Sequence, residues 1–536
     1  MSMMRIGGIA SGFDTEQIIR DMMRVERMKV DRTFQQGQTL QWQKEQYREM
    51  TNKVRSFRDT YFDILRPETN MASAASLKKM NASSSDSAKV SASANADAAV
   101  GSYEFQVIQS ATAATATAPA ATKDSGDGAR LNLGDTMETV SGKLANGDFE
   151  FDENGNFSLS INDKQITINK NDTLRTALSK INSSGAGVQA SYSTFSDTFT
   201  FTSQATGDKY ITTDDGGNFF SALGIDVDAE TGNIGQSGRD AVFTINGFEG
   251  TRSANTFTID GITYSINQKI DEADNADPVQ INVAVDSDAI YNTIETFIED
   301  YNKLIDDISS KLREERFRGY PPLTDEQKEA MSDREIEKWE EMAQSGLLRG
   351  DSALEGMLRD MRSAIYSAVG SDHLTAMGIE TSRNYLDNGK LVLRNGGADL
   401  RAAITENPDR VVDLFTRSSE ISYSPNLSPE ERTQRYNESG LAHRLSDVLQ
   451  DNIRTSRNSS GRKGTLIERA GIEGDSSEFS NFYDRQIRQV NERIDQINTR
   501  LQRKEEQLWR QFTAMEKSLE QLYSQGDWLT QQLQQL

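Results

Sequence analysis

The chain has 536 residues, no cysteine, two histidines and a formal net charge of −23 at pH 7. Without cysteine there are no disulfides and no thiolate metal sites, and two histidines offer little to imidazole metal chemistry. With no concentrated basic face, nucleic acid is not an expected partner. No stretch reaches the ~18 consecutive apolar residues of a membrane span, and the start lacks the apolar core of a secretory signal, so we expect neither a membrane span nor a cleaved signal peptide.

The negative charge is concentrated in the middle of the sequence. Residues 66–480 carry a formal −25, whereas residues 1–65 carry +2 and residues 481–536 carry 0. Near-neutral ends can pack closely with like chains, while an acidic body stays solvated and resists nonspecific association.

A long amphipathic helix is predicted near the N-terminus. Asp14, with Gln17 three residues later, can cap its start, and it can continue to about Leu65 before Pro67 ends it. Gly37 dilutes the stripe in its middle. The apolar stripe consists of Leu40, Tyr47, Met50, Val54, Phe57, Tyr61 and Ile64.

Short strands and turns dominate the next two hundred residues. After an Ala/Ser-rich stretch (72–100) comes a strand at 103–109, and the low-complexity segment 111–128 reads as a mobile connection. Further on, a short helix over 172–185 is stopped by Gly185. A second β block begins near residue 242, where Asp260-Gly261 predicts a type I′ hairpin. The strands expected between 131 and 286 lie at 157–162, 165–170, 188–193, 198–203, 242–247 and 279–286.

The remaining chain has mainly helical periodicity. A strong amphipathic helix follows Asp286, and two capping boxes, Thr324–Gln327 and Ser332–Glu335, predict two short helices. The later segments are helices with a small strand pair around Asn388-Gly389 (346–415), a polar loop (418–434), a helix (441–456), a Gly/Ser-rich stretch (457–477) and a terminal helix from about Phe479.

The terminal helix carries a coiled-coil seam, with apolar residues three and four apart. Eleven residues separate Leu501 from Phe512, which places a four-residue stutter in the repeat, and Gly526 occupies a seam position. Two interpretations stay open: a hairpin of the two terminal helices within one chain, or outer helix ends that become ordered only on a partner. The seam residues are Ile487, Val490, Ile494, Ile497, Leu501, Leu508, Phe512, Met515, Leu519, Leu522, Leu529, Leu533 and Leu536.

We therefore expect an α+β multidomain fold with terminal coiled-coil helices, a helical domain built from both ends of the chain, and two inserted mainly-β domains. The expected division is an N-terminal leg helix (1–45), two parts of the helical domain (46–78 and 288–480), two parts of an inner β domain (79–130 and 236–287), an outer β domain (131–235) and a C-terminal leg helix (481–536).

No pattern in the sequence indicates catalysis. Phosphate-binding loops and nucleophile elbows are absent. The segment Asp226, Asp228, Glu230 and Gly232 departs from calcium-loop spacing, and Asp214-Asp215 before two glycines is typical of a solvated turn. We therefore expect no cofactor, no metal site and no enzymatic activity.

Five segments, taken together and in order, resemble the bacterial flagellar filament-capping family, also called hook-associated protein 2. They are IGGIASGFDTEQIIRDMM (6–23), DTLRTALSKINSSGAGVQASYS (172–193, similar to the hook-type IN motif), FIEDYNKLI (297–305), GLLRGDSALEGML with the following 374–415, and QFTAMEKSLEQLYSQGDWLTQQL (511–533).

The resemblance implies a structural protein exported through the growing flagellum by the type III apparatus and located outside the cell at the filament tip. It implies a closed ring of subunits that promotes flagellin insertion, with terminal helices as legs that contact the filament end or the hook–filament junction protein. A cytoplasmic export chaperone would hold the C-terminal helix. The alternatives are another flagellar axial protein, such as flagellin or a junction protein, and a surface adhesin that binds host glycans or mucin.

Overall fold

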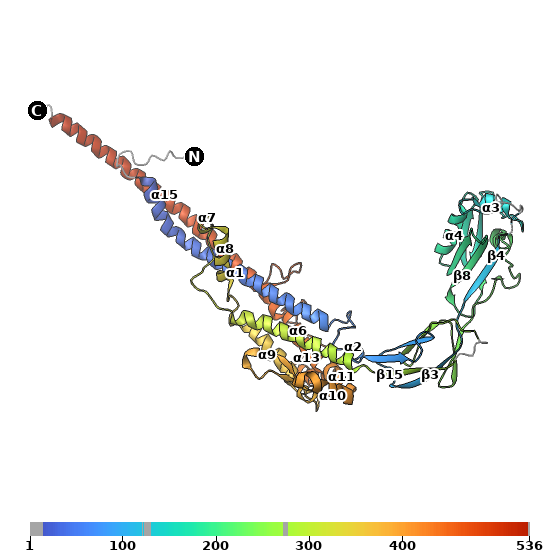
Figure 1. The fold of residues 1–536 in the computed structure, drawn as a ribbon. Coiled ribbons are helices and arrows are strands. Elements are labelled where there is room, and N and C mark those ends of the chain that lie inside the picture. The colour runs from blue at the N-terminus through green and yellow to red at the C-terminus, as the bar shows by residue number, and fades with distance from the viewer. Residues whose placement is uncertain (1–13, 121, 123–129, 272–276, 534–536) are drawn as a thin grey trace. The chain divides into compact units, whose positions relative to one another are not determined.

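The computed structural model describes residues 14–120, 122, 130–271 and 277–533. The chain divides into two compact units, one built from both ends of the sequence (up to Leu77 and from Ser287) and one from Lys78–Asp286 (Figure 1). The predicted α+β fold, with long terminal helices and β-rich insertions, is confirmed.

The first unit is helical. Its core forms where α6 packs against α1, and Phe297 lies 5.8 Å from Phe57 and 5.2 Å from Tyr61 between ring centres. Its elements are α1 (Thr15–Tyr61), α2 (Ala74–Leu77), α6 (Ser287–Arg313), α7 (Asp325–Glu329), α8 (Asp333–Gln344), α9 (Ser352–Tyr366), β16 (Ile379–Thr381), β17 (Leu391–Leu393), α10 (Ala398–Glu406), α11 (Pro408–Thr416), α12 (Pro429–Glu438), α13 (Leu441–Ile453), α14 (Thr465–Ala470) and α15 (Phe482–Leu533).

Local sequence signals account for several boundaries in this unit. Asp14 accepts a hydrogen bond from the backbone N–H of Gln17, and both predicted capping boxes form at the starts of α7 and α8. The first helix ends at Tyr61, earlier than predicted, and the side chain of Asp63 accepts the backbone N–H of Leu65 in a local turn. Such Asp-centred turns compete with helix continuation.

The second unit contains two hydrophobic cores. The first lies between a five-stranded antiparallel sheet, in the order β1-β15-β3-β11-β12, and a three-stranded sheet, β13-β14-β2. Asp260 and Gly261 both have positive φ in the tight β13–β14 turn, as predicted. The strands are β1 (Met80–Ser84), β2 (Val90–Ala94), β3 (Gly101–Gln109), β11 (Ala241–Ile245), β12 (Phe248–Arg252), β13 (Thr256–Ile259), β14 (Ile262–Ile266) and β15 (Val279–Val285).

The second core belongs to the residues inserted between β3 and β11, which we call the lobe. It lies under a three-stranded sheet, β4-β8-β7, and two strand pairs, β5-β6 and β10-β9. The elements are β4 (Ala113–Pro119), α3 (Met137–Lys143), β5 (Asn156–Ile161), β6 (Lys164–Asn169), α4 (Leu174–Ser183), β7 (Val188–Ser193), β8 (Thr198–Thr206), β9 (Ile211–Thr212), α5 (Phe219–Ala222) and β10 (Asn233–Ile234).

Two segments predicted to be connections contain regular structure. Much of the segment expected to be a mobile connection is strand β4, because its Ala/Thr alternation places Ala114, Ala116 and Ala118 in the core and the threonines on the other face; residues 121 and 123–128 of that segment lie outside the described part of the chain. The expected loop 418–434 contains the start of α12, which Ser428 and Glu431 cap reciprocally ahead of Pro429 at the first turn. Both errors came from treating polar, low-complexity composition as absence of structure.

The lobe contains an internal repeat that sequence reading missed. In each copy an Asp-Thr pair begins a helix: Asp135-Thr136 before α3 and Asp172-Thr173 before α4. Each Asp accepts the backbone N–H of the residue three before it and pairs with a lysine at the far end of its helix, Lys143 at 2.8 Å and Lys180 at 2.6 Å. The two copies meet through reciprocal backbone hydrogen bonds at the Thr136–Thr173 bridge.

Candidate functional site

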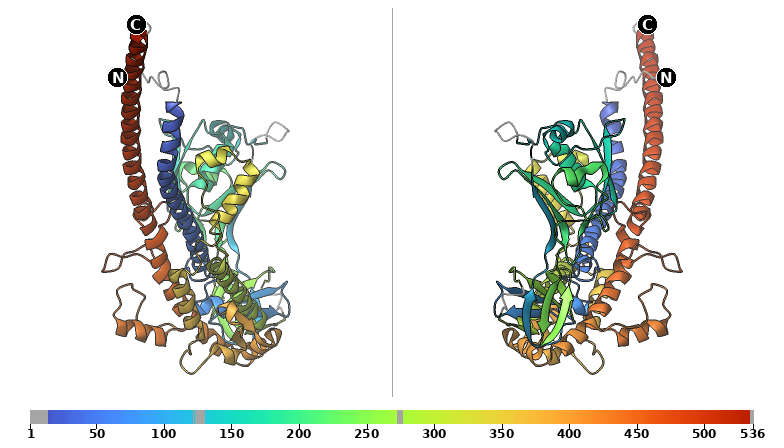
Figure 2. Two further views of the ribbon diagram at one scale, coloured as in Figure 1. Left: turned by 90° about the vertical axis from the view of Figure 1, so that its left-hand side faces the viewer. Right: turned by 90° about the vertical axis from the view of Figure 1, so that its right-hand side faces the viewer.

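The two longest helices, α1 and α15, lie side by side in an antiparallel coil (Figure 2). Near the start of α1, Ile19 and Met23 cluster with Leu508 of α15. Near its middle, Lys44 Nζ lies 2.6 Å from Asp484 Oδ1, and the rings of Tyr47 and Tyr483 are 5.5 Å apart. We call this paired structure the terminal coil; it corresponds to the intramolecular hairpin considered above.

The inner end of the terminal coil is held by buried polar contacts. The side chains of Lys44 and Asp484 are only 10% and 13% exposed. Arg48 of α1 donates to the carbonyl oxygen of Ala470 at 3.1 Å, which ties α1 to the end of α14. Burial raises the pKa of Tyr47 far above its usual range. This end is therefore held by a buried ion pair between α1 and α15 and by a hydrogen bond from α1 to the end of α14.

Gly37 of α1 lies in close contact with α15. A Cβ atom built on Gly37 would lie 3.1 Å from Cγ1 of Val490. The interpretation that Gly37 merely dilutes the stripe is wrong, because its missing side chain makes room for Val490. Gly526, by contrast, has no atom within 4 Å of a built Cβ and lies on open helix surface.

The predicted N-terminal stripe serves two different contacts. Tyr47, Met50 and Val54 are fully buried, and Phe57 and Tyr61 pack on α6, so the second half of the stripe belongs to the helical core. Leu40 is half-buried. Ile64 lies beyond the end of α1 and is 83% exposed, so the helical stripe does not reach it.

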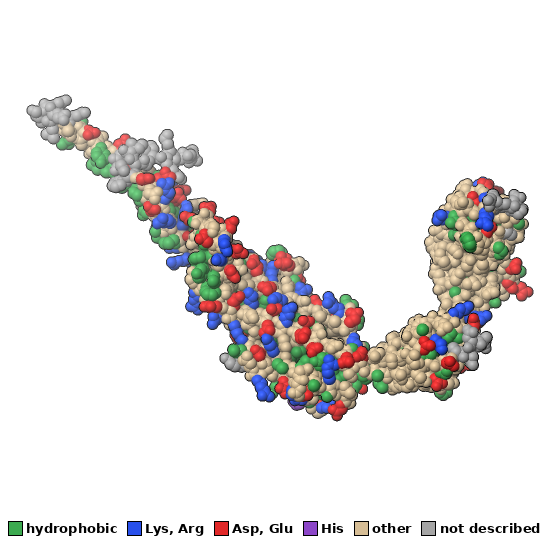
Figure 3. Space-filling view, in the orientation of Figure 1, with side chains coloured by type: hydrophobic (Ala, Val, Ile, Leu, Met, Phe, Trp, Pro, Cys, Tyr) green, Lys and Arg blue, Asp and Glu red, His purple; other side chains and the backbone are tan. Residues whose placement is uncertain are grey.

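The C-terminal seam is buried or half-buried up to Phe512 and contains exposed residues beyond it. Val490 and Leu508 are buried, and Ile487, Ile494, Ile497, Leu501, Phe512 and Leu519 are half-buried. Met515, Leu522 and Leu529 are exposed, and hydrophobic side chains are visible along this end in Figure 3. The side chain of Leu533, and Leu536 altogether, lie outside the described part of the chain.

Several coil residues were missed by sequence reading. Ile19 and Met23 pack on α15, and Trp42 forms a small cluster with Ala343 and Leu347. The signal for Ile19 and Met23 was present in the sequence, since both lie on one heptad-like track with Val30, Gly37 and Leu40. The predicted stripe began only at Leu40, so it left out the outer half of the track.

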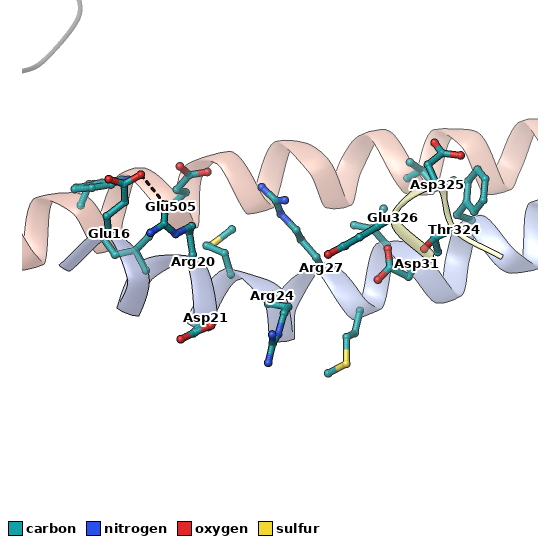
Figure 4. A pocket seen from close by; sticks show the side chains of 17 residues that line it. Glu16, Arg20, Asp21, Arg24, Arg27, Asp31, Thr324, Asp325, Glu326 and Glu505 are labelled. Carbon is teal, nitrogen blue, oxygen red and sulfur yellow. Dashed lines mark hydrogen bonds and ion pairs between the residues drawn. The ribbon is translucent and has the colours of Figure 1, made fainter. Parts of the chain in front are cut away.

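A groove of about 610 Å³ runs along one side of the terminal coil, between α1, α15 and the start of α7 (Figure 4). Its apolar lining comprises Ile19, Met23, Met28, Val30, Phe34, Ile494 and Trp509. Arg20, Arg24 and Arg27 follow one another along α1 at its rim, and Arg20 points toward its ion-pair partner Glu16 and toward Glu505.

Carboxylates gather at one end of this groove. Asp31 of α1 lies near Glu326 of α7, with Asp325 beside them (Figure 4). Burial raises the pKa of Asp31, the charge of Glu326 raises it further, and Arg27 opposes the shift. The lining of the groove thus combines apolar side chains with three arginines and six carboxylates, since Glu16, Asp21 and Glu505 also line it.

The acidic segments at 214–217 and 226–232 form turns. Asp228 accepts backbone N–H groups of Glu230 and Thr231, and those bonds lower its pKa. Asp215 accepts the N–H of Phe220 at the start of α5. Across residues 14–120, 122, 130–271 and 277–533, no group of three or more His, Cys, Asp or Glu side chains is placed to hold a metal ion. None of the helices in those ranges is long and apolar enough for a bilayer.

Family profiles match most of the chain. Residues 11–114 match the profile described as Flagellar hook-associated protein 2 N-terminus, residues 238–524 match Flagellar hook-associated protein 2 C-terminus, and residues 156–205 match Flagellin hook IN motif. The second of these alone spans more than half of the chain.

Individual proteins agree with the profiles. The chain is 31% identical to the flagellar hook-associated protein 2 of Halalkalibacterium halodurans, over 97% of this chain and 98% of that protein. It is 29% identical to the Thermotoga maritima protein of the same name, over 70% of this chain and 54% of that one. The crystal structure of the flagellar cap protein FliD D1-D2-D3 domains from Escherichia coli has the same fold, with a TM-score of 0.52 at 19% identity over 77% of this chain and 97% of that one.

Proposed function

The chain belongs to the flagellar hook-associated protein 2 family of flagellar cap proteins, and from this we propose that it forms the structural cap at the distal end of a bacterial flagellar filament. In this proposal several copies form a closed ring that promotes the folding and insertion of flagellin subunits and prevents their loss to the medium. The protein does no chemistry of its own.

The uncovered end of the terminal coil is the observation that carries this proposal. Within unit 1, α15 continues past the described start of α1, and its seam residues Met515, Leu522 and Leu529 are exposed there. An exposed apolar stripe on a long helix is unfavourable in water unless something covers it. A filament end, the hook–filament junction protein and a neighbouring copy are partners that can supply that cover.

The proposal also covers the chaperone, the subunit contacts, the domain division and the export route. Before export, a cytoplasmic chaperone would cover the end of α15 and prevent aggregation. The seam positions on both terminal helices would serve contacts between subunits or with the filament. The finer division of the chain into leg helices, helical domain and inner and outer β domains belongs to this proposal, as does export to the filament tip without a cleaved signal.

Deletion of the gene tests the function directly. We expect short or absent filaments and flagellin monomers in the culture medium, measured by electron microscopy and by immunoblotting. Plasmid-borne wild-type chain should restore filaments. Intact filaments after deletion, with loss only of adhesion to a surface, would instead favour the adhesin.

A matched pair of complementing variants tests the role of the exposed seam. Leu522→Glu with Leu529→Glu places charge on the seam, whereas Gln521→Glu with Thr530→Glu places equal charge elsewhere on the same exposed end of α15. We expect the first pair to fail to retain flagellin and the second to support growth. Equal filament length for both pairs would remove the seam from the mechanism.

A further inference from the structure

The groove on the terminal coil combines exposed apolar side chains with a negative charge balance. Its lining holds six carboxylates and three arginines, and Arg20 is already paired with Glu16. Met28 is 50% exposed and Phe34 is 36% exposed there. Exposed apolar side chains of this size are unfavourable in water, so the groove suits an apolar segment that carries positive charge.

The thirteen residues before Asp14, MSMMRIGGIASGF, have that composition. Seven of them are apolar, and Arg5 is their single charged side chain. The next residue, Asp14, caps α1, and Glu16 lies at the end of the groove that is farther from Asp31 and Glu326 (Figure 4). This N-terminal segment is therefore joined to the chain beside one end of the groove.

We propose that residues 1–13 fold back along α1 and occupy the groove of the same copy. Their apolar side chains cover Met28 and Phe34, and Arg5 lies beside Asp31 and Glu326. Attachment at Asp14 favours the segment of the same copy, because a short tether holds it at a high effective concentration. The contact depends neither on the cap nor on the ring proposed above.

The carboxylates at the α7 end are suited to receive the guanidinium group of Arg5. Asp31 is half-buried, and the charge of Glu326 acts on it, with Asp325 beside them. In the described part of the chain none of these three carboxylates forms an ion pair with a lysine or arginine. An arginine placed there would be stabilised by more than one carboxylate at once.

The chain lengths agree with this alignment. Asp31 lies seventeen residues after Asp14, which is about 26 Å along the helix at about 1.5 Å per residue. Arg5 lies nine residues before Asp14, and an extended chain of that length spans about 30 Å at about 3.3 Å per residue. The excess, together with the long arginine side chain, allows the chain to reverse direction. Gly12 suits that turn, because glycine adopts either sign of φ.

An introduced cysteine pair tests the contact, because the chain has no cysteine of its own. Gly7→Cys is combined either with Met28→Cys in the groove or with Met22→Cys, which lies outside its lining. The two methionines are 50% and 47% exposed, and Met22 is nearer to Asp14 along α1, so tethering alone favours the control.

The full-length chains are treated with a short bis-maleimide, and cross-linked peptides from the monomer are measured by mass spectrometry. We expect roughly tenfold more cross-linking within one chain for the pair with Met28→Cys, because a seated segment stays beside that position.

Charge reversal tests the part played by Arg5. Arg5→Glu should lower the yield of the pair with Met28→Cys about fivefold, because it sets a third charge of the same sign beside Asp31 and Glu326. Adding Asp31→Arg and Glu326→Arg should restore the yield. Arg32→Glu, on α1 outside the groove lining, is the control and should leave the yield unchanged.

Three results would overturn the proposal. Equal yields at Met22 and Met28 would mean that the segment is not seated in the groove. A yield that does not respond to Arg5→Glu would remove the carboxylates from the contact. Cross-links between two chains, seen as dimers whose yield rises with concentration, would assign the groove to the segment of a second copy.

Discussion

The buried ion pair between Lys44 and Asp484 gives the sharpest test of how the terminal coil is held together. The charged atoms are 2.6 Å apart, and both side chains are almost fully enclosed. Asn481 supplies Asp484 with an additional hydrogen bond. Lys44→Met keeps the length of the side chain but removes its charge, so the carboxylate of Asp484 stays buried with Asn481 as its remaining side-chain donor.

The expected cost follows from that geometry. Removing one partner of a buried pair costs about 3–5 kcal/mol, and we expect about 2–3 kcal/mol here because Asn481 continues to stabilise the carboxylate. Adding Asp484→Asn should recover at least half of the loss, since the uncompensated charge disappears.

Hydrogen exchange measures this loss locally, without requiring two-state unfolding of the whole chain. Amides of α1 and α15 around the pair should exchange roughly 30- to 150-fold faster in Lys44→Met, since about 1.4 kcal/mol corresponds to a factor of ten. The control is Arg510→Met on α15, whose side chain lies 3.9 Å from Glu506 with both side chains about 70% exposed. It should change exchange by less than about threefold.

Two results would refute this reasoning. One is an equal effect of Lys44→Met and Arg510→Met, which would mean that burial does not strengthen the inner pair. The other is no recovery in the double variant, which would mean that lost packing of the lysine stem, rather than an unpaired carboxylate, causes the destabilisation.

Further predictions concern the rest of the chain. Ala116→Glu should unfold the lobe that contains β4, measured by proteolysis, because it buries a carboxylate in the core, whereas Thr117→Glu on the exposed face of β4 should leave the lobe resistant. Hydrogen bonds from Lys463 and Ser477 hold the pKa of Asp475 far below its usual range, so the contact stabilises the α14 segment above about pH 4 and is lost as the pH falls further. Exchange of α14 amides, corrected for intrinsic rates, should therefore accelerate in acid in the wild type but show little acid dependence in Asp475→Asn. Asp135→Ala and Asp172→Ala should each lower the melting temperature of the lobe by a similar amount, since the two side chains make equivalent contacts; a large effect of only one would argue against equivalence of the repeats.

Elements defined by local contacts were predictable. Three features depend on residues only a few positions apart: the amphipathic period of α6, the caps of α7 and α8, and the Asp260-Gly261 turn. The local sequence is therefore sufficient to predict them. The errors have a different cause. The Ala/Thr alternation of β4 has the period of a half-buried strand, but alanine buries so little surface that composition alone does not distinguish it from a linker.

By itself, the sequence determined that both ends of this chain are long amphipathic helices, that β structure lies between them, and which family they resemble, because helix period and short motifs depend on neighbouring residues. Only the tertiary structure decided which helix faces meet. It placed Val490 against Gly37, moved the second half of the N-terminal stripe into the helical core, and left the end of α15 uncovered. A stripe shows that a helix face is apolar, whereas the element that packs against it depends on the register and on contacts between residues more than two hundred positions apart.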